Sequence, residues 1–317
     1  MARYVVGRIY TRCFVQREMA ISPEIAVEPL PATRHKGSIF DGKDLLERAG
    51  HPITRKVVEQ SLANAAAAGA AVCIRFRNIE AADAPTAMKN TEAHGDVIAG
   101  ALSVLSVNPA VPLVTFCSRS DGSDGAIHWE FPNDPIISHG TNIPGYLDVV
   151  PALVAKALVD PKVALLLSLY RASQREPDAD KKMLFQLILL EEASDVETGT
   201  LAARLTSFFV KHGVLGDFDA IAAQAGLELP AGKTLVDALV KLRNSAAHNG
   251  EITEQTLRDG SAEWLIPLIA NKDGLHRLVG EAIRYTLAVL AGHSRDLKAL
   301  AIELRPGEQF EVRFDDP

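Results

Sequence analysis

Residues 233–250 read KTLVDALVKLRNSAAHNG, and this stretch predicts one amphipathic helix with a defined end. Its apolar residues recur at i, i+4, i+7 and i+11, a spacing that gathers them on one side of a helix. They are Leu235, Leu239, Leu242 and Ala246. Asn249-Gly250 follows directly, and a residue in the left-handed conformation commonly ends a helix at such a position. The stretch therefore predicts a helix that packs one face against a core.

Three polar residues, Arg243, Asn244 and His248, occur near the end of this helix. At about 100° per residue, Asn244 and His248 share the side away from the apolar stripe, whereas Arg243 flanks the stripe. Five residues separate Arg243 from His248, so the two groups meet only if the last turn loosens or a second subunit completes the site. A simpler interpretation is that both side chains only satisfy the last carbonyl groups of the helix.

The rest of the C-terminal half has the same helical character. Apolar periodicity, with caps or breakers between segments, predicts a series of further helices. Their expected ranges are 147–159, 161–175, 180–194, 199–213, 217–225, 253–270 and 271–291. Residues 298–314 instead alternate around a Pro-Gly pair at 306–307, which predicts a type II turn and a short β-hairpin tail.

The N-terminal half is mixed and rich in strands. Alternation and β-branched residues predict strands, and capped periodic segments predict helices. The expected strands are Ala2–Val15, Ala71–Ile79 and a hairpin of Val111–Ser118 with Ala126–Phe131, and the expected helices are Asp41–Ala49, Thr54–Ala68 and Thr86–Val107. Residues 132–145 hold three prolines and two glycines, as a linker does. We therefore expect an α+β protein with a recognition or regulatory domain at 1–145 and an antiparallel helical bundle with its hairpin tail at 146–317.

Composition argues against disulfide-rich, zinc-ribbon and membrane-spanning proteins. The three cysteines, Cys13, Cys73 and Cys117, are far apart and form no CxxC pair, which argues against a disulfide scaffold or a zinc ribbon. No apolar run approaches the roughly 20 residues of a membrane-spanning helix, and arginines interrupt the first apolar stretch, so we expect a cytoplasmic protein. The net charge is −7, and residues 151–317 carry 19 Lys and Arg against 24 Asp and Glu. This balance argues against tight non-specific binding of nucleic acid, although a nuclease can gather its positive charge at one cleft.

The segment Arg243-Asn244-Ser245-Ala246-Ala247-His248 resembles the R-x4-6-H motif of HEPN domains, including the polar residue directly after the arginine. The helical setting is also similar, since that family is an antiparallel bundle with the motif late in one helix. The resemblance covers about residues 151–295. The order of a recognition domain followed by a HEPN-like domain resembles the layout of bacterial abortive-infection and other antiviral defence proteins.

This resemblance implies metal-independent cleavage of RNA at a homodimer interface, where two copies of the motif face each other, without a cofactor. His248 would move the proton of the ribose 2′-hydroxyl or of the leaving oxygen, because imidazole titrates near neutral pH. Arg243 would stabilise charge on the phosphoryl oxygens, and Asn244 would bind the phosphate or orient His248. A protein trigger or inhibitor would act at the N-terminal domain. The alternative is a catalytically inactive HEPN-like module that dimerises or binds a partner.

Several other residues are weaker candidates. The family often has an acidic residue on an earlier helix. Glu191 or Glu192 would suit that role, but an exposed acidic pair explains both residues as well, and neither is assigned to the site. Arg75, Arg77 and Arg119 would suit a basic patch or the solvated face of a strand. Cys117 and His128 would suit a thiol–imidazole pair, although nothing in the sequence places them together. The remaining histidines are scattered without the spacing of a metal site.

Overall fold

The computed structural model describes residues 2–13, 15, 18–29, 71–106, 109–130, 149–194, 199–216, 219, 229–269 and 272–292. The chain forms two compact units, Met1–Asp178 and Ala179–Pro317. The first combines an antiparallel sheet with helices, and the described part of the second is helical. The expected mixed α+β class is therefore confirmed. Five expected segments fall wholly or almost wholly outside the described residues: 41–49, 54–68, 132–145, 217–225 and 298–314.

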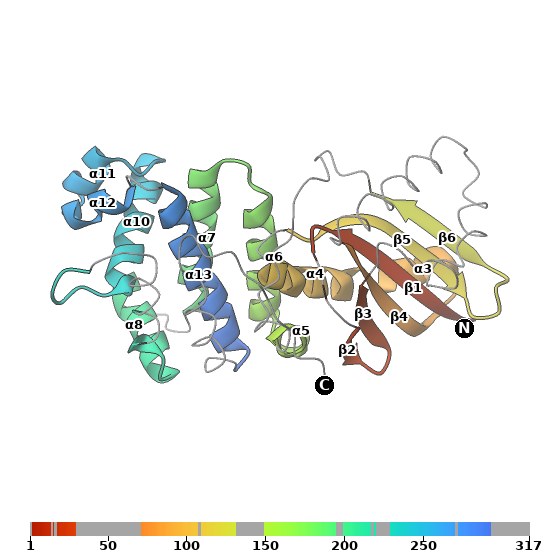
Figure 1. Cartoon of the computed structure of the whole chain (residues 1–317). Coiled ribbons are helices and arrows are strands. Elements are labelled where there is room, and N and C mark those ends of the chain that lie inside the picture. Colours follow the sequence, from red (N-terminus) through yellow and green to blue (C-terminus); the bar gives the residue numbers. More distant parts are fainter. Residues whose placement is uncertain are drawn as a thin grey trace, which may run out of the picture. The chain divides into compact units, whose positions relative to one another are not determined.

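The sheet of the first unit has the strand order β2-β3-β4-β1-β5-β6, and every neighbouring pair is antiparallel (Figure 1). The strands are β1 (Ala2–Thr11), β2 (Met19–Ser22), β3 (Ile25–Pro29), β4 (Ala71–Ala81), β5 (Val111–Arg119) and β6 (Gly125–Trp129). Most of the predicted strands are confirmed, including the hairpin of β5 and β6. The short strands β2 and β3 were not predicted, because four or five residues next to prolines show too little alternation to detect.

β1 lies between β4 and β5, and this central position explains why nearly all of it is buried. Gly7 permits the closest packing there, because a Cβ on Gly7 would lie 2.0 Å from Cζ of Phe116, its partner on β5. The phenyl ring therefore occupies space that only a glycine leaves open.

Four helices complete the described part of the first unit: α3 (Ala84–Asn90), α4 (Glu92–Ser106), α5 (Val149–Val159) and α6 (Pro161–Arg175). The single helix expected at 86–107 is two helices, because α3 begins after its N-cap Asp83 and ends at Thr91. α3 packs on β4 and β5, and α4 packs on α5 and α6. α5 and α6 belong to this compact unit, which ends at Asp178, and the domains expected at 1–145 and 146–317 stay a prediction.

The second unit contains α7 (Ala179–Ala193), α8 (Leu201–Lys211), α10 (Leu235–Asn249), α11 (Glu254–Asp259), η2 (Glu263–Leu265), α12 (Ile266–Ile269) and α13 (Lys272–Leu290). α7 packs against α13 and α10, and α10 also contacts α8. The one helix expected at 253–270 is broken at Gly260-Ser261, where Ser261 has a φ of +52°. Within the described ranges, no helix has both the length and the apolar character needed to cross a membrane.

Candidate functional site

The predicted helix at 233–250 is confirmed as α10, and both of its ends are fixed by local chemistry. At the start, Thr234 and Asp237 form a capping box, in which each side chain accepts a hydrogen bond from the other's backbone N–H. At the end, Gly250 has a φ of +74° and its N–H donates to the carbonyl of Ala246. Defined ends hold the polar residues of the last two turns in a fixed register.

Replacing the cap residue should weaken this helix measurably. We expect Thr234→Ala to lower the free energy of unfolding by about 1 kcal/mol, because the backbone N–H of Asp237 loses its acceptor at the helix start. Urea unfolding of the variant measures the change. Ser207→Ala, an exposed serine inside α8, is the control and should shift the midpoint far less.

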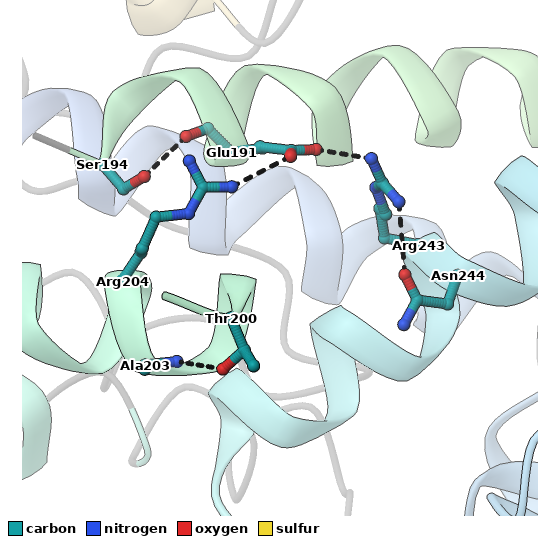
Figure 2. Close-up of polar contacts among 7 residues, drawn as sticks. All are labelled: Glu191, Ser194, Thr200, Ala203, Arg204, Arg243 and Asn244. Atoms are coloured by element: carbon teal, nitrogen blue, oxygen red, sulfur yellow. Dashed lines mark hydrogen bonds and ion pairs between the residues drawn. The ribbon is translucent and has the colours of Figure 1, made fainter. Parts of the chain in front are cut away.

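Arg243 lies on α10 with its guanidinium directed at α7 (Figure 2). Its Nη2 donates to Oε2 of Glu191 at 2.7 Å, while Arg204 of α8 donates through Nη2 to Oε1 of the same carboxylate at 3.0 Å. Glu191 thus joins three helices by receiving one guanidinium on each oxygen. We call Glu191, Arg204 and Arg243 the Glu191 cluster.

The Glu191 cluster carries surplus positive charge, because two guanidinium groups face one carboxylate. The side chains of Glu191, Arg204 and Arg243 are 23%, 21% and 27% exposed, so solvent screens their charges only partly. Among the described residues, Nε of each arginine is buried without a hydrogen-bond partner. Unsatisfied buried donors cost stability, so each guanidinium retains hydrogen-bonding capacity that the Glu191 cluster does not use.

Asn244 and His248 occupy the neighbouring part of α10. Oδ1 of Asn244 accepts a hydrogen bond from Nη1 of Arg243 at 3.3 Å, so the side-chain amide turns toward the guanidinium (Figure 2). His248 is exposed in the last turn. Five residues along an α-helix correspond to a rotation of about 140° and a rise of about 7.5 Å. A single chain therefore presents Arg243 and His248 on different faces of α10 and does not bring their functional groups together.

Chemically, the arrangement offers a positioned cation, an amide and an accessible imidazole along one helix end. A guanidinium can bind phosphoryl oxygens through two parallel hydrogen bonds, and an exposed imidazole can take up or release a proton near neutral pH. Arg243 presents these donors to an external phosphate only if Glu191 shares or releases it. Without a bound phosphate, the hydrogen bond to Glu191 holds the guanidinium of Arg243 in a defined orientation.

Two members of the Glu191 cluster were absent from the predicted site. The sequence predicts an exposed pair at Glu191-Glu192, whereas only Glu192 is exposed. The apolar residues of 183–190 are too continuous to show which glutamate turns inward. Nothing in the sequence indicates Arg204, which comes to Glu191 from the next helix along the chain.

The three arginines of the candidate basic patch in the first unit all contact carboxylates. Arg75 donates to Glu28 at 2.7 Å, Arg77 lies 3.8 Å from the other oxygen of that carboxylate, and Arg119 is paired with Asp121 at 3.2 Å. Each of the three guanidinium groups therefore has a carboxylate partner. Arg119 and Asp121 compensate each other, whereas Arg75 and Arg77 share the one carboxylate of Glu28 and leave one positive charge in excess, as in the Glu191 cluster.

The cysteines have the properties of core residues. All three are buried, and burial raises the pKa of Cys73 and of Cys117 to about 12 and raises that of Cys13 as well. A thiol needs to ionise before it acts as a nucleophile, so Cys117 is unsuited to a pair with His128. Across the described residues, no group of three or more His, Cys, Asp or Glu side chains has an arrangement that could hold a metal ion.

These thiols should resist modification in the folded protein. We expect Ellman's reagent at pH 8 to react with the native chain slowly and incompletely, because burial both blocks access and keeps the thiols protonated. The same titration in about 6 M guanidinium chloride should reveal all three thiols at once. Rapid reaction of any thiol in the native protein would show that its strand is open to solvent.

No protein-family model, curated protein sequence or solved structure is significantly similar to this chain.

Proposed function

We propose that the chain is a metal-independent endoribonuclease of the HEPN type, built on Arg243, Asn244 and His248 of α10, and that it acts as a homodimer. The observation that carries this proposal is the contact between Arg243 and Glu191. An acidic residue on an earlier helix is expected beside the motif arginine in that family. Glu191 is the acidic residue in contact with Arg243 in this chain, although the sequence alone does not distinguish it from Glu192.

The surplus charge of the Glu191 cluster supports the same function. The protein is acidic overall, so an RNA-cleaving site requires a local positive charge. Two half-buried guanidinium groups around one carboxylate provide it. Partly desolvated arginines attract a phosphate more strongly than fully exposed lysines do, because solvent screens them less.

The geometry of α10 supports the proposed dimer. Arg243 and His248 lie about 140° apart around the helix, and a second copy of α10 would supply the missing group on each side. In the proposed reaction the ribose 2′-oxygen attacks phosphorus while one His248 takes its proton. The bond from phosphorus to the 5′-oxygen breaks, and the same His248 returns the proton to that oxygen through solvent. The products are a 2′,3′-cyclic phosphate and a 5′-hydroxyl, and no metal or redox partner is required.

A second function, a catalytically inactive dimerisation or adaptor module, is favoured by one observation. Phe185 and Ile188 are exposed on α7, the helix that carries Glu191, at 44% and 37%. Two large apolar side chains one turn apart suit a protein interface. In that case the Glu191 cluster would serve only to join α7, α8 and α10.

Cleavage of RNA in the presence of EDTA distinguishes the two functions. We expect the purified protein to degrade total RNA with EDTA present, to leave 5′-hydroxyl and 2′,3′-cyclic phosphate ends, and to spare DNA of matched sequence. A 2′-hydroxyl nucleophile explains all three results. Cleavage that needs Mg²⁺, or that cuts DNA equally, would contradict the proposal, as would intact RNA.

A further inference from the structure

The first unit contains a cavity of about 460 Å³ at the edge of the sheet beside α3. Its floor is formed by three consecutive cross-strand partners, since Arg8 of β1 pairs with Thr115 of β5, and Thr115 pairs with His128 of β6. Residues directly opposite one another in an antiparallel sheet project from the same face. The register therefore places a guanidinium, a hydroxyl and an imidazole in one row across three strands.

Arg8 is an unusual residue for the floor of a cavity. Only 7% of it is exposed, and its hydrogen bonds go to uncharged oxygens. Nη2 donates to the carbonyl of Met88 at 2.5 Å and Nε donates to Oγ1 of Thr91 at 3.2 Å. These contacts fix the plane of the guanidinium. Among the described residues, Nη1 has no hydrogen-bond or ion-pair partner.

The fold makes room for this buried charge. A Cβ on Gly95 of α4 would lie 2.7 Å from Cδ of Arg8, so a glycine at this position of the helix leaves space for the arginine side chain. A buried charge normally has an opposite charge beside it. Glu92 and Glu130 also border the cavity, but neither forms an ion pair with Arg8. The guanidinium is thus oriented and desolvated without a carboxylate.

We propose that this cavity binds a small molecule through an anionic group, either a carboxylate or a phosphate monoester. The anion accepts hydrogen bonds from Nη1 of Arg8 and from the hydroxyl of Thr115. Lys89 also lines the cavity, and the exposed side chains of Lys89 and His128 add donors for the same group. Met88 and Ala126 provide apolar contact for the rest of the ligand. The volume lies within the usual range for small-molecule sites, about 300–1,000 Å³.

This site belongs to the sheet unit and does not depend on the chemistry proposed for α10. Glu92 and Glu130 restrict the ligand, because a second anionic group near the mouth would meet their charges. A compact ligand with one anionic end and an apolar body fits both the floor and the border. The expected ligands are therefore small organic acids or phosphate esters.

Two fluorinated probes, 4-fluorobenzoate and 4-fluorophenyl phosphate, test this proposal by fluorine NMR on the full chain. We expect at least one of them to bind, with 4-fluorobenzyl alcohol, the uncharged analogue, binding at least tenfold more weakly. Arg8→Met should weaken binding of the anion about 10- to 100-fold. Ala126→Phe should abolish binding by filling the cavity, whereas Ala172→Phe, at an exposed position of α6, should leave it unchanged.

Some results would contradict the proposed binding of an anionic ligand. Failure of both anions to bind at about 5 mM would overturn the proposal, as would equal binding of the uncharged analogue. If Arg8→Met does not fold, Ala126→Phe decides the matter, because β6 is the edge strand and accepts a larger side chain more easily. Unchanged binding to a folded Ala126→Phe protein would place the ligand outside this cavity.

Discussion

Replacing His248 with alanine should reduce RNA cleavage by a factor of about 10² to 10⁴ and leave the stability of the protein unchanged. The loss is expected because the proposed reaction moves a proton at each of two oxygens, and imidazole is the group on α10 suited to that role near neutral pH. The stability is expected to hold because His248 is exposed, and substitutions at exposed positions usually change it by less than about 0.5 kcal/mol. Initial rates on a labelled RNA and urea unfolding measure the two quantities separately.

His94→Ala is the matched control for this variant. His94 is also an exposed histidine on a helix, α4 of the first unit, and the proposed reaction does not use it. Both variants should unfold like the parent protein, and only His248→Ala should lose cleavage. Equal cleavage by the parent and by His248→Ala would remove His248 from the mechanism.

Replacing Glu191 with alanine should lower the free energy of unfolding of the helical unit by about 1–3 kcal/mol. This loss is smaller than for a fully buried ion pair, because the Glu191 cluster is partly exposed to solvent. The reason is electrostatic: the change leaves Arg204 and Arg243 half-buried and facing each other without the carboxylate that both contact. Removal of either arginine should cost less, because Glu191 then keeps one partner. Urea unfolding followed by circular dichroism measures these differences.

Glu192→Ala is the control for Glu191→Ala. The two glutamates are adjacent on α7 and carry the same charge, but Glu192 is exposed. A general effect of net charge would appear in both variants, whereas loss of the Glu191 cluster appears in one. If the two variants unfold at the same urea concentration, the cluster does not contribute to joining α7, α8 and α10.

Regular elements with strong local signals were predicted well. The ends of α10 depend on neighbouring residues, the capping box at Thr234 and the left-handed Gly250, so its bounds could be placed within two residues. Most strands of the sheet could be predicted because alternation of apolar and polar residues is also a local signal. The short β2 and β3 were missed because their partners, rather than their own sequence, determine that they are strands.

The boundary between the units shows a second limit of sequence patterns. Pro and Gly residues predict a linker at 132–145, outside the described residues, whereas α5 and α6 pack on α4 and belong to the same compact unit as the sheet. Helical periodicity shows that a helix has an apolar face and does not show which partner covers it. Only the tertiary contacts assign α5 and α6 to the first unit.

Some residues of the candidate site are close in the sequence, and others come together only in the folded chain. Arg243, Asn244 and His248 lie within six residues of one another, so a motif could reveal them. Glu191 contacts Arg243 from α7, and Arg204 of α8 contacts the same carboxylate, but no local pattern links either residue to Arg243. The sequence thus indicated which residues of α10 to consider, and the packing of α7 and α8 revealed what orients Arg243.

Mixing two inactive variants tests most directly whether two copies of α10 form one ribonuclease site. Arg243→Gln and His248→Ala, unfolded together in equal amounts and refolded, give about half of all dimers one intact Arg243 and one intact His248 if subunits pair at random. We predict that the mixture cleaves RNA in EDTA well above the rate of either variant refolded alone. A mixture no more active than its separate components would contradict the proposed intersubunit site.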